Sequence, residues 1–361
     1  MPIMKVKPFG ITATFAIIIL SVGLVNHVLI VPLLLGEAGR DAWMSVLLSL
    51  TVILPWSLIP LCAILKKMNK TRIDIWLKER LHPLIAGALI TYFLILIMIT
   101  GLETLIVTSS WTGTSYLPRT PFLAIIIILL CLCHYAASMG LRTIAYISCL
   151  LIPIVVFFGD FVMSANMPNK DYRYVLPMLE HGAIPVITAS MNCLTAFSEL
   201  FSLLFIQHHM SKRMSRWHMI ILVLFLALLA IGPILGAISE FGPVEATKLK
   251  YPAYSQWRLV TVGKYFEHVD FLAIFQWLAG ALVRISLAIY ILIEFSPINR
   301  MKRKWAGYLI ISVVFVIFAT YWTNHMSLYQ EIIKWRFKNI GLITLMVVLF
   351  IYAISFMKKR R

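Results

Sequence analysis

Long apolar runs separated by short polar and charged stretches dominate the chain. A membrane-spanning helix needs about 20 predominantly apolar residues, and ten of the runs are close to that length or longer. Helices are expected, because lipid offers no partner for an open backbone polar group. The ten predicted spans are Gly10–Leu35, Ala42–Leu65, Pro83–Trp111, Pro121–Ser138, Thr143–Ser164, Pro185–Gln207, Trp217–Ser239, Phe271–Phe295, Trp305–Thr323 and Ile340–Met357.

The first run follows Lys5 and Lys7, an arrangement that also begins secretory signal peptides. It is too long for a signal peptide and lacks a small-residue cleavage site, so we interpret it as a retained span.

The composition narrows the class of protein. Of the 361 residues, 61% are hydrophobic and 13% are charged, with a mean hydropathy of +0.89. Soluble domains average about 45–50% apolar and about 25% charged residues. This excludes a soluble enzyme, a disordered chain and a disulfide scaffold, and predicts a multi-pass helical membrane protein.

The net charge of +17 is distributed unevenly. With the amino terminus cytoplasmic, twenty of the basic residues fall in inner segments and eleven in outer segments, among them Lys334, Arg336 and Lys338. Cytoplasmic loops carry an excess of Lys and Arg, so both termini are predicted to be cytoplasmic. The excess charge therefore belongs to one side of the membrane and does not indicate a nucleic-acid partner.

Ten spans with both ends inside permit two five-helix halves of opposite orientation, as in many secondary transporters. We predict one domain over residues 1–361, with repeat one at about 10–164 and repeat two at about 185–357. The first helix of each half is then interrupted in mid-membrane. Small and polar residues at Ser21–His27 and Thr188–Glu199 suit such interruptions. The alternative is that they only allow close helix packing.

Charges inside the spans are costly, at about 2.5–3.5 kcal/mol each at mid-bilayer, and should be paired or interfacial. Asp160 and Glu294 lie near span ends and are read as interfacial. Arg284 lies near the centre of span eight and cannot lose its proton. Its candidate partners are Glu199 and Glu103.

Two interpretations of Arg284 remain open. It forms a structural ion pair that locks the bundle, or it is a fixed cation where related folds bind a coupling cation. His27 at mid-span is either a proton carrier or ligand contact, or a packing residue.

No motif indicates an enzyme, a metal site or a redox pair, so no cofactor is expected. All five cysteines lie in apolar spans. The connection Glu240–Asp270 either folds over the outer mouth of the bundle or lies on the membrane. The basic segment Lys66–His82 either binds anionic lipid or a partner, or only sets topology.

Several features along the chain carry a family resemblance. They are Gly36–Trp43 (GEAGRDAW), Leu117–Pro121 (LPRTP), Gly140 with Arg142, Leu176–Gly182 (LPMLEHG) before Pro185, Glu199, Tyr251-Pro252, Gly263–Asp270 (GKYFEHVD) and Trp277. In their order and spacing the chain resembles, over its whole length, the B-subunit permease of bacterial spore germinant receptors. That family is a branch of the amino acid–polyamine–organocation superfamily. A basic residue that the family often has near positions 146 and 268 is replaced by Tyr146 and His268.

The resemblance implies a fold and a role. The fold is an all-α integral membrane protein of ten transmembrane helices, a 5+5 inverted-repeat transporter fold with helices one and six discontinuous. Such subunits lie in the spore inner membrane and sense small germinants, typically amino acids, together with an A subunit and a lipoprotein C subunit. The ligand lies between spans one, three, six and eight. Carried over to this chain, it meets Val22, Gly23, Leu24, Asn26, Gly101, Leu194, Phe197, Ile285 and Ser286.

Two other functions remain open at this stage. One is a secondary active amino acid transporter, with proton coupling through His27 or Glu199. The other is a non-binding scaffold or ion-conducting subunit of a larger assembly.

Overall fold

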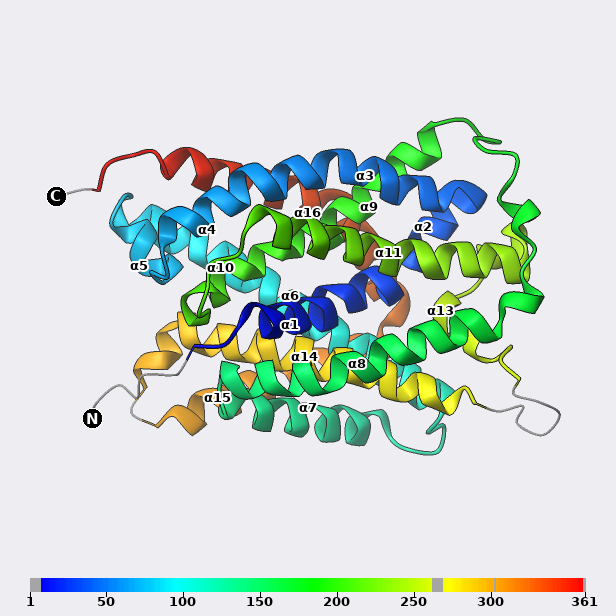
Figure 1. The fold of residues 1–361 in the computed structure, drawn as a ribbon. Coiled ribbons are helices and arrows are strands. Elements are labelled where there is room, and N and C mark those ends of the chain that lie inside the picture. The colour runs from blue at the N-terminus through cyan, green and yellow to red at the C-terminus, as the bar shows by residue number, and fades with distance from the viewer. Residues whose placement is uncertain (1–7, 262–268, 302, 360–361) are drawn as a thin grey trace.

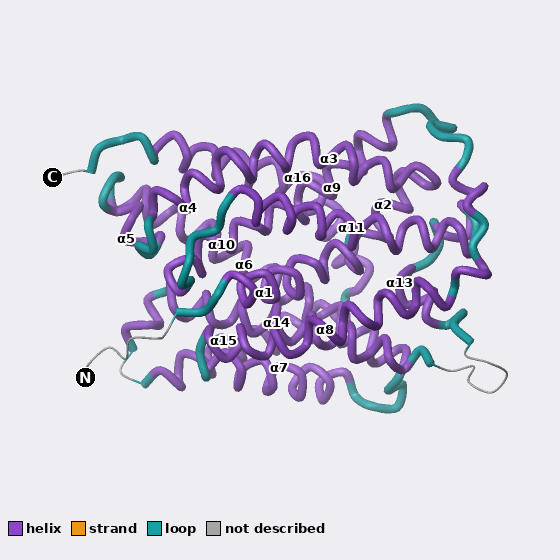
Figure 2. The backbone as a smooth tube through the Cα atoms, viewed as in Figure 1, coloured by secondary structure: helices purple, strands orange, loops and turns teal. Residues whose placement is uncertain are grey.

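The computed structural model describes residues 8–261, 269–301 and 303–359. These residues form a bundle of long helices that lie roughly parallel or antiparallel to one another (Figure 1; Figure 2). Apart from one parallel bridge between Phe9 and Met210, the described residues contain no strand. Lys5, Lys7, Lys302, Arg360 and Arg361 of the inner basic set, and Gly263–His268 of the family pattern, lie outside the described residues.

Sixteen α-helices are present in the described parts of the chain. They are α1 Ile11–Leu24, α2 Val31–Ala38, α3 Ala42–Trp56, α4 Cys62–Met68, α5 Ile73–Lys78, α6 Pro83–Ser115, α7 Phe122–Ser138, α8 Leu141–Ala165, α9 Ile184–Ser198, α10 Leu203–Ile206, α11 Arg216–Phe241, α12 Pro243–Ala246, α13 Pro252–Trp257, α14 Phe271–Phe295, α15 Lys304–Asn324 and α16 Met326–Ile354. The end of the bundle where α1 begins and α16 ends is called the proximal end, and the other the distal end (Figure 1).

The predicted multi-pass helical architecture is confirmed. In the described residues, eight helical runs are long and apolar enough to cross a membrane. The first of these, Ile11–Met68, contains the first two predicted spans, which separate at a 3₁₀ turn, Gly39–Asp41. Gly39 has a φ of +54°, a left-handed value that favours glycine. The fourth predicted span corresponds to α7, an apolar helix of 17 residues.

One predicted boundary is wrong. The last helix begins at Met326 rather than at Ile340, so Arg336 lies inside α16 and not in an outer loop. Arg336 is only 5% exposed and pairs with the carboxylate of Glu103 on α6. In the sequence, Lys334 and Lys338 on either side of Arg336 favour an outer loop. The buried carboxylate of Glu103 compensates the charge of Arg336 and allows it to lie inside the helix.

The run containing α9 and α10 and the helix α14 form the centre of the bundle. They are the most buried of the long helices, whereas α8 and α15 are the least buried. Helix α9 packs on α16 and α3, and α14 packs on α6 and α1. The apolar outer faces of α8 and α15 suit contact with lipid.

The two predicted interruptions appear as changes of helix type without unwinding: the first overlaps the predicted stretch Ser21–His27, whereas the predicted stretch Thr188–Glu199 is α-helical up to Ser198. In the first span a π-helical segment, η1 (Val25–Leu29), follows α1. There the Ile30 N–H donates to the Val25 carbonyl, five residues back, at 3.0 Å. Pro32 has no N–H and disturbs the carbonyl four residues before it, which favours this wider turn. In the sixth span a 3₁₀ segment, η6 (Glu199–Ser202), separates α9 from α10.

The α9–α16 contact depends on Gly341 and yields a first prediction. A Cβ at position 341 would lie 2.4 Å from the Thr195 backbone nitrogen. The Gly341 N–H also donates to the Thr195 hydroxyl at 2.8 Å. Gly341→Ala should lower the free energy of unfolding by about 1–3 kcal/mol, as overpacking does.

Thermal unfolding of the purified protein in detergent measures this effect. The matched control is Gly87→Ala in α6, where nothing lies within 4 Å of the added Cβ. The control should be neutral or slightly stabilising, because alanine favours helix more than glycine. Equal effects of the two substitutions would contradict the packing argument.

Candidate functional site

A buried ion pair between Arg284 and Glu199 lies at the centre of the bundle. Arg284 on α14 is 3% exposed, and Glu199, the first residue of η6, is 5% exposed. The pair is bidentate, with Nη1 2.5 Å from Oε2 and Nη2 2.9 Å from Oε1 of the carboxylate. Planar two-point contacts of this kind combine strength with a fixed orientation.

The same guanidinium contacts two further helices. Arg284 Nε donates to the Thr104 hydroxyl on α6 at 2.8 Å, and Nη1 donates to the Ser21 carbonyl on α1 at 3.0 Å. The Ser21 carbonyl lies one turn before η1, and Glu199 begins η6. Arg284 therefore joins α14 to α6 and to both interrupted helices.

A small cavity lies beside this pair. Its volume is about 20 Å³, which holds about one water molecule. The polar part of its lining includes Glu199, Arg284 and Ser202, and the Ser202 hydroxyl is buried without a hydrogen-bond partner. The full lining is Ser21, Val22, Ile97, Thr100, Glu199, Phe201, Ser202, Arg284, Leu287, Ala288 and Ile291. These residues come from spans one, three, six and eight.

A second buried ion pair lies next to the first. Glu103 on α6 accepts a short hydrogen bond from Arg336 Nη2 on α16, and both residues are at most 5% exposed. Glu103 precedes Thr104, so consecutive residues of α6 contact the two arginines. Of the two carboxylates weighed from the sequence, Glu199 is the partner of Arg284, and Glu103 belongs to Arg336.

Aromatic side chains close the distal end. The rings of Trp111 and Trp277 stack with centroids 4.1 Å apart, and Tyr254 of α13 packs against Trp111. The Tyr116 hydroxyl donates to the Asp270 carbonyl at 2.7 Å. Burial raises the pKa of Tyr251, which packs on Trp277, to about 12. The described part of the long connection thus packs on the bundle through Tyr251 and Tyr254, as one of its two interpretations requires.

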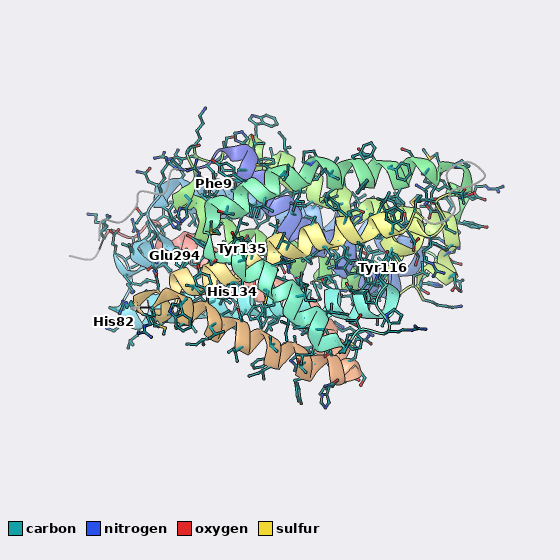
Figure 3. All side chains as sticks on the ribbon, turned by 90° about the horizontal axis from the view of Figure 1, so that it is seen from below. Phe9, His82, Tyr116, His134, Tyr135 and Glu294 are labelled. Carbon is teal, nitrogen blue, oxygen red and sulfur yellow. The ribbon has the colours of Figure 1, made fainter. Side chains whose placement is uncertain are left out.

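Backbone and amide contacts close the proximal end. The Phe9 N–H donates to the His209 carbonyl at 3.1 Å, and Gln207 Nε2 donates to the Thr71 carbonyl at 2.6 Å. Arg72 pairs with Glu294 at 2.5 Å at the end of α14, in accordance with an interfacial position. Figure 3 shows Phe9 and Glu294 toward this end and Tyr116 toward the other.

The ligand residues expected in span one fall into two groups. Val22 lines the cavity, whereas a Cβ at Gly23 would point at Leu229 of α11, 2.8 Å away. Leu24 packs beside Gly280 of α14. Asn26 is fully buried; its Nδ2 donates to the Val22 carbonyl at 3.0 Å, and its Oδ1 has no partner.

His27 and the expected residues of spans three, six and eight lie outside the lining. The His27 Nδ1 is 3.0 Å from the Leu229 carbonyl, a contact expected of a packing residue. A Cβ at Gly101 would lie 2.9 Å from Ala288, so Gly101 allows α6 to approach α14 closely. The remaining residues are buried but absent from the cavity wall: Leu194, Phe197, Ile285 and Ser286.

Sequence reasoning missed most of the cavity wall. Ser202 follows the polar stretch that ends at Glu199 by three residues, and a 3₁₀ turn has three residues per turn. That spacing is the one signal that places Ser202 beside Glu199. The apolar lining residues Ile97, Phe201, Leu287 and Ile291 resemble every other apolar residue of their spans.

The side chains around the cavity are suited to binding a ligand more than to catalysing a reaction. The cavity offers one carboxylate, one guanidinium and hydroxyl groups, with an apolar wall. One N–H of Arg284 Nη2 has no hydrogen bond among the described residues. No cluster of metal-ligating side chains occurs in the part of the chain that the structure describes. In this arrangement the cavity has room for about one water molecule.

Comparisons with known proteins agree with this architecture. The family model described as spore germination protein matches residues 10–327. The chain is 37% identical over 289 residues to Spore germination protein XB of Bacillus anthracis, covering 80% of this chain and 81% of that protein. Two mutant forms of the Eremococcus coleocola manganese transporter share the fold, with TM-scores of 0.50 and 0.51 at 13% identity. The likeness covers 94% of this chain and 78% of each transporter.

The central pair gives a second prediction. Glu199→Gln leaves the guanidinium of Arg284 buried without a counter-charge, which typically costs about 3–5 kcal/mol of stability. Arg284→Gln leaves the carboxylate in the same position. The double variant, E199Q/R284Q, removes both charges and should cost much less than the sum of the single changes.

Denaturant or thermal unfolding in detergent supplies the four free energies of this double-mutant cycle. A coupling energy near zero would contradict the role assigned to the pair. The control cycle is Lys248 and Glu245, whose side chains are mostly exposed and pair at 3.2 Å. An exposed pair contributes at most about 1 kcal/mol.

Proposed function

Because this chain belongs to the spore germination protein family, we propose that it is the membrane subunit of a germinant receptor that binds a small germinant beside Arg284 and Glu199. The cavity beside the bidentate pair is the observation that supports this most strongly, since its lining comes from spans one, three, six and eight, between which the family resemblance implies that the ligand lies. The family and the fold point to a permease or receptor-type membrane protein and not to an enzyme.

An amino acid fits the charges of this cavity best. Its carboxylate would meet the uncommitted N–H of Arg284, and its ammonium group would meet Glu199. The apolar wall of Leu287, Ala288 and Ile291 would receive an aliphatic side chain. A volume of about 20 Å³ holds only about one water, so the lining helices must separate before the ligand enters.

Binding would then shift a conformational equilibrium. A ligand that competes for Arg284 weakens the bond joining α14 to η6, and so favours a different arrangement of the interrupted helices. We propose that an A subunit and a lipoprotein C subunit read this change and trigger germination. The proposed location is the spore inner membrane, with both termini cytoplasmic.

The transporter fold favours a second candidate, a secondary active amino acid transporter, with proton coupling through Glu199. The two functions share one site and differ in whether ligand is released on the other side. Accumulation of labelled amino acid in proteoliposomes under a proton gradient would identify the transporter.

The unpartnered hydroxyl of Ser202 provides the most direct test of the site. Ser202→Ala removes a buried group with no protein partner, so the fold should be unaffected. If that hydroxyl binds the germinant, a panel of amino acids on spores carrying S202A should show an approximately tenfold higher half-maximal concentration, as loss of one hydrogen bond predicts.

Ser109→Ala is the matched control. Its hydroxyl is likewise buried and unpartnered, but it does not line the cavity. Germination by S109A spores should match that of the parent strain. An unchanged response of S202A, with normal protein levels, would contradict the placement of the ligand.

The fixed guanidinium predicts how binding depends on ions. Arg284 supplies a permanent positive charge in the site, so a coupling cation would be repelled from it. Ligand binding to the purified protein should have the same Kd in sodium chloride and in choline chloride at equal ionic strength. A requirement for Na⁺ would show that Arg284 does not replace a cation.

A further inference from the structure

A row of phenylalanine rings runs from the central cavity to the proximal end. Phe201 of η6 lines the cavity, and its ring centroid lies 4.8 Å from that of Phe93 on α6. Phe205 of α10 packs on Phe93 at 5.9 Å, and on Phe295 at the end of α14 at 4.9 Å. These four residues are called the phenylalanine cluster. They come from three of the four spans that line the cavity.

The phenylalanine cluster is almost completely buried. Phe93 and Phe205 are 0% exposed, and Phe201 is 2% exposed. The helix α10 around Phe205 is apolar and fully buried over its whole length, Leu203–Ile206. A ligand that carries charges would lose its hydration in this packing and gain no hydrogen bond from the rings. The path from the cavity to the proximal end is therefore closed to a polar molecule.

The path from the cavity to the distal end is lined by polar groups instead. Thr104 and Thr108 lie one turn apart on α6, and their hydroxyls accept from Arg284 at 2.8 Å and from the Trp277 indole at 3.1 Å. Trp111, further along the same helix, stacks on Trp277, and its indole N–H is buried without a partner. These donors and hydroxyls can bond to water or to a polar ligand that passes them.

The two ends therefore differ in what opening them would expose. At the distal end the Tyr116 hydroxyl donates to the Asp270 carbonyl at 2.7 Å, and the Tyr254 hydroxyl donates to the Asp270 carboxylate at 3.2 Å. Water can replace bonds of this kind with little net loss. At the proximal end, separation of the helices would bring the rings of the phenylalanine cluster into water, which is unfavourable. The difference favours opening at the distal end.

We propose that the ligand enters and leaves the central cavity through the distal end only, because the phenylalanine cluster keeps the proximal end closed. This inference rests on the proposed function and separates its two candidates. Alternating access requires that the same site open to each side in turn. A site that opens to one side senses its ligand and does not carry it across the membrane.

Cysteine labelling in membrane vesicles tests the proposal. Ser202→Cys places a thiol in the cavity wall, and a charged methanethiosulfonate reagent that cannot cross the membrane is added from one side. S202C should react from the distal side and not from the proximal side. Two exposed positions mark the sides, K212C at the proximal end and R173C at the distal end. The parent protein with its five native cysteines gives the background rate.

Phe205→Ala tests the phenylalanine cluster itself. In the S202C protein, F205A should allow the reagent to react from the proximal side as well, whereas F205L retains an apolar side chain and should not. The matched control is F337A, because Phe337 of α16 is also 0% exposed and lies outside the cluster. F337A should leave the labelling restricted to the distal side.

Reaction of S202C from the proximal side without a change in the cluster, or from neither side, would overturn the proposal. Equal proximal reaction in F205A and F337A would mean that any loss of packing opens this end, and would also overturn it. If F205A fails to fold, the two rates of S202C alone still decide. The labelling needs no germinant, so its outcome is independent of the germination test with S202A.

Discussion

The bidentate contact between Arg284 and Glu199 is the interaction on which the centre of this protein depends. An arginine that cannot lose its proton is tolerable in the middle of a membrane bundle only when its charge is compensated and its donors are used. One guanidinium binds a carboxylate in the sixth span, a hydroxyl in the third and a carbonyl in the first. The positions of four helices are therefore fixed by a single side chain, and the cavity lies beside it because these helices meet there.

The same interaction explains why the two interruptions differ in form and still act together. The first span widens into a π turn before Pro32, and the sixth narrows into a 3₁₀ turn that begins with Glu199 itself. Neither helix is unwound, so few backbone groups are free for a ligand. Side chains at the turns carry the polar chemistry instead, in particular Glu199 and the unpartnered hydroxyl of Ser202.

Sequence predicts the gross architecture well, because length and hydropathy determine which runs lie in lipid. It also reduces the partners of Arg284 to two carboxylates, since few acids occur inside the spans. It fails at Arg336, where neighbouring lysines resemble a loop and the compensating Glu103 is far away in the chain. It also fails for most of the cavity wall. A helix that is apolar on every side gives no indication of which face meets the cavity, so Ile97 and Leu287 could be assigned only from the fold.

Helix α6 carries a further mechanical consequence. Glu103 and Thr104 are consecutive residues, about 100° apart around the helix axis, and each contacts a different buried arginine. A rotation of α6 that releases one arginine necessarily moves the atom that contacts the other. The Thr104–Arg284 contact and the Glu103–Arg336 contact are thus coupled through one rigid helix. A rotation of α6 that changed the contact of Thr104 with Arg284 would therefore also displace the carboxylate that holds Arg336 on α16.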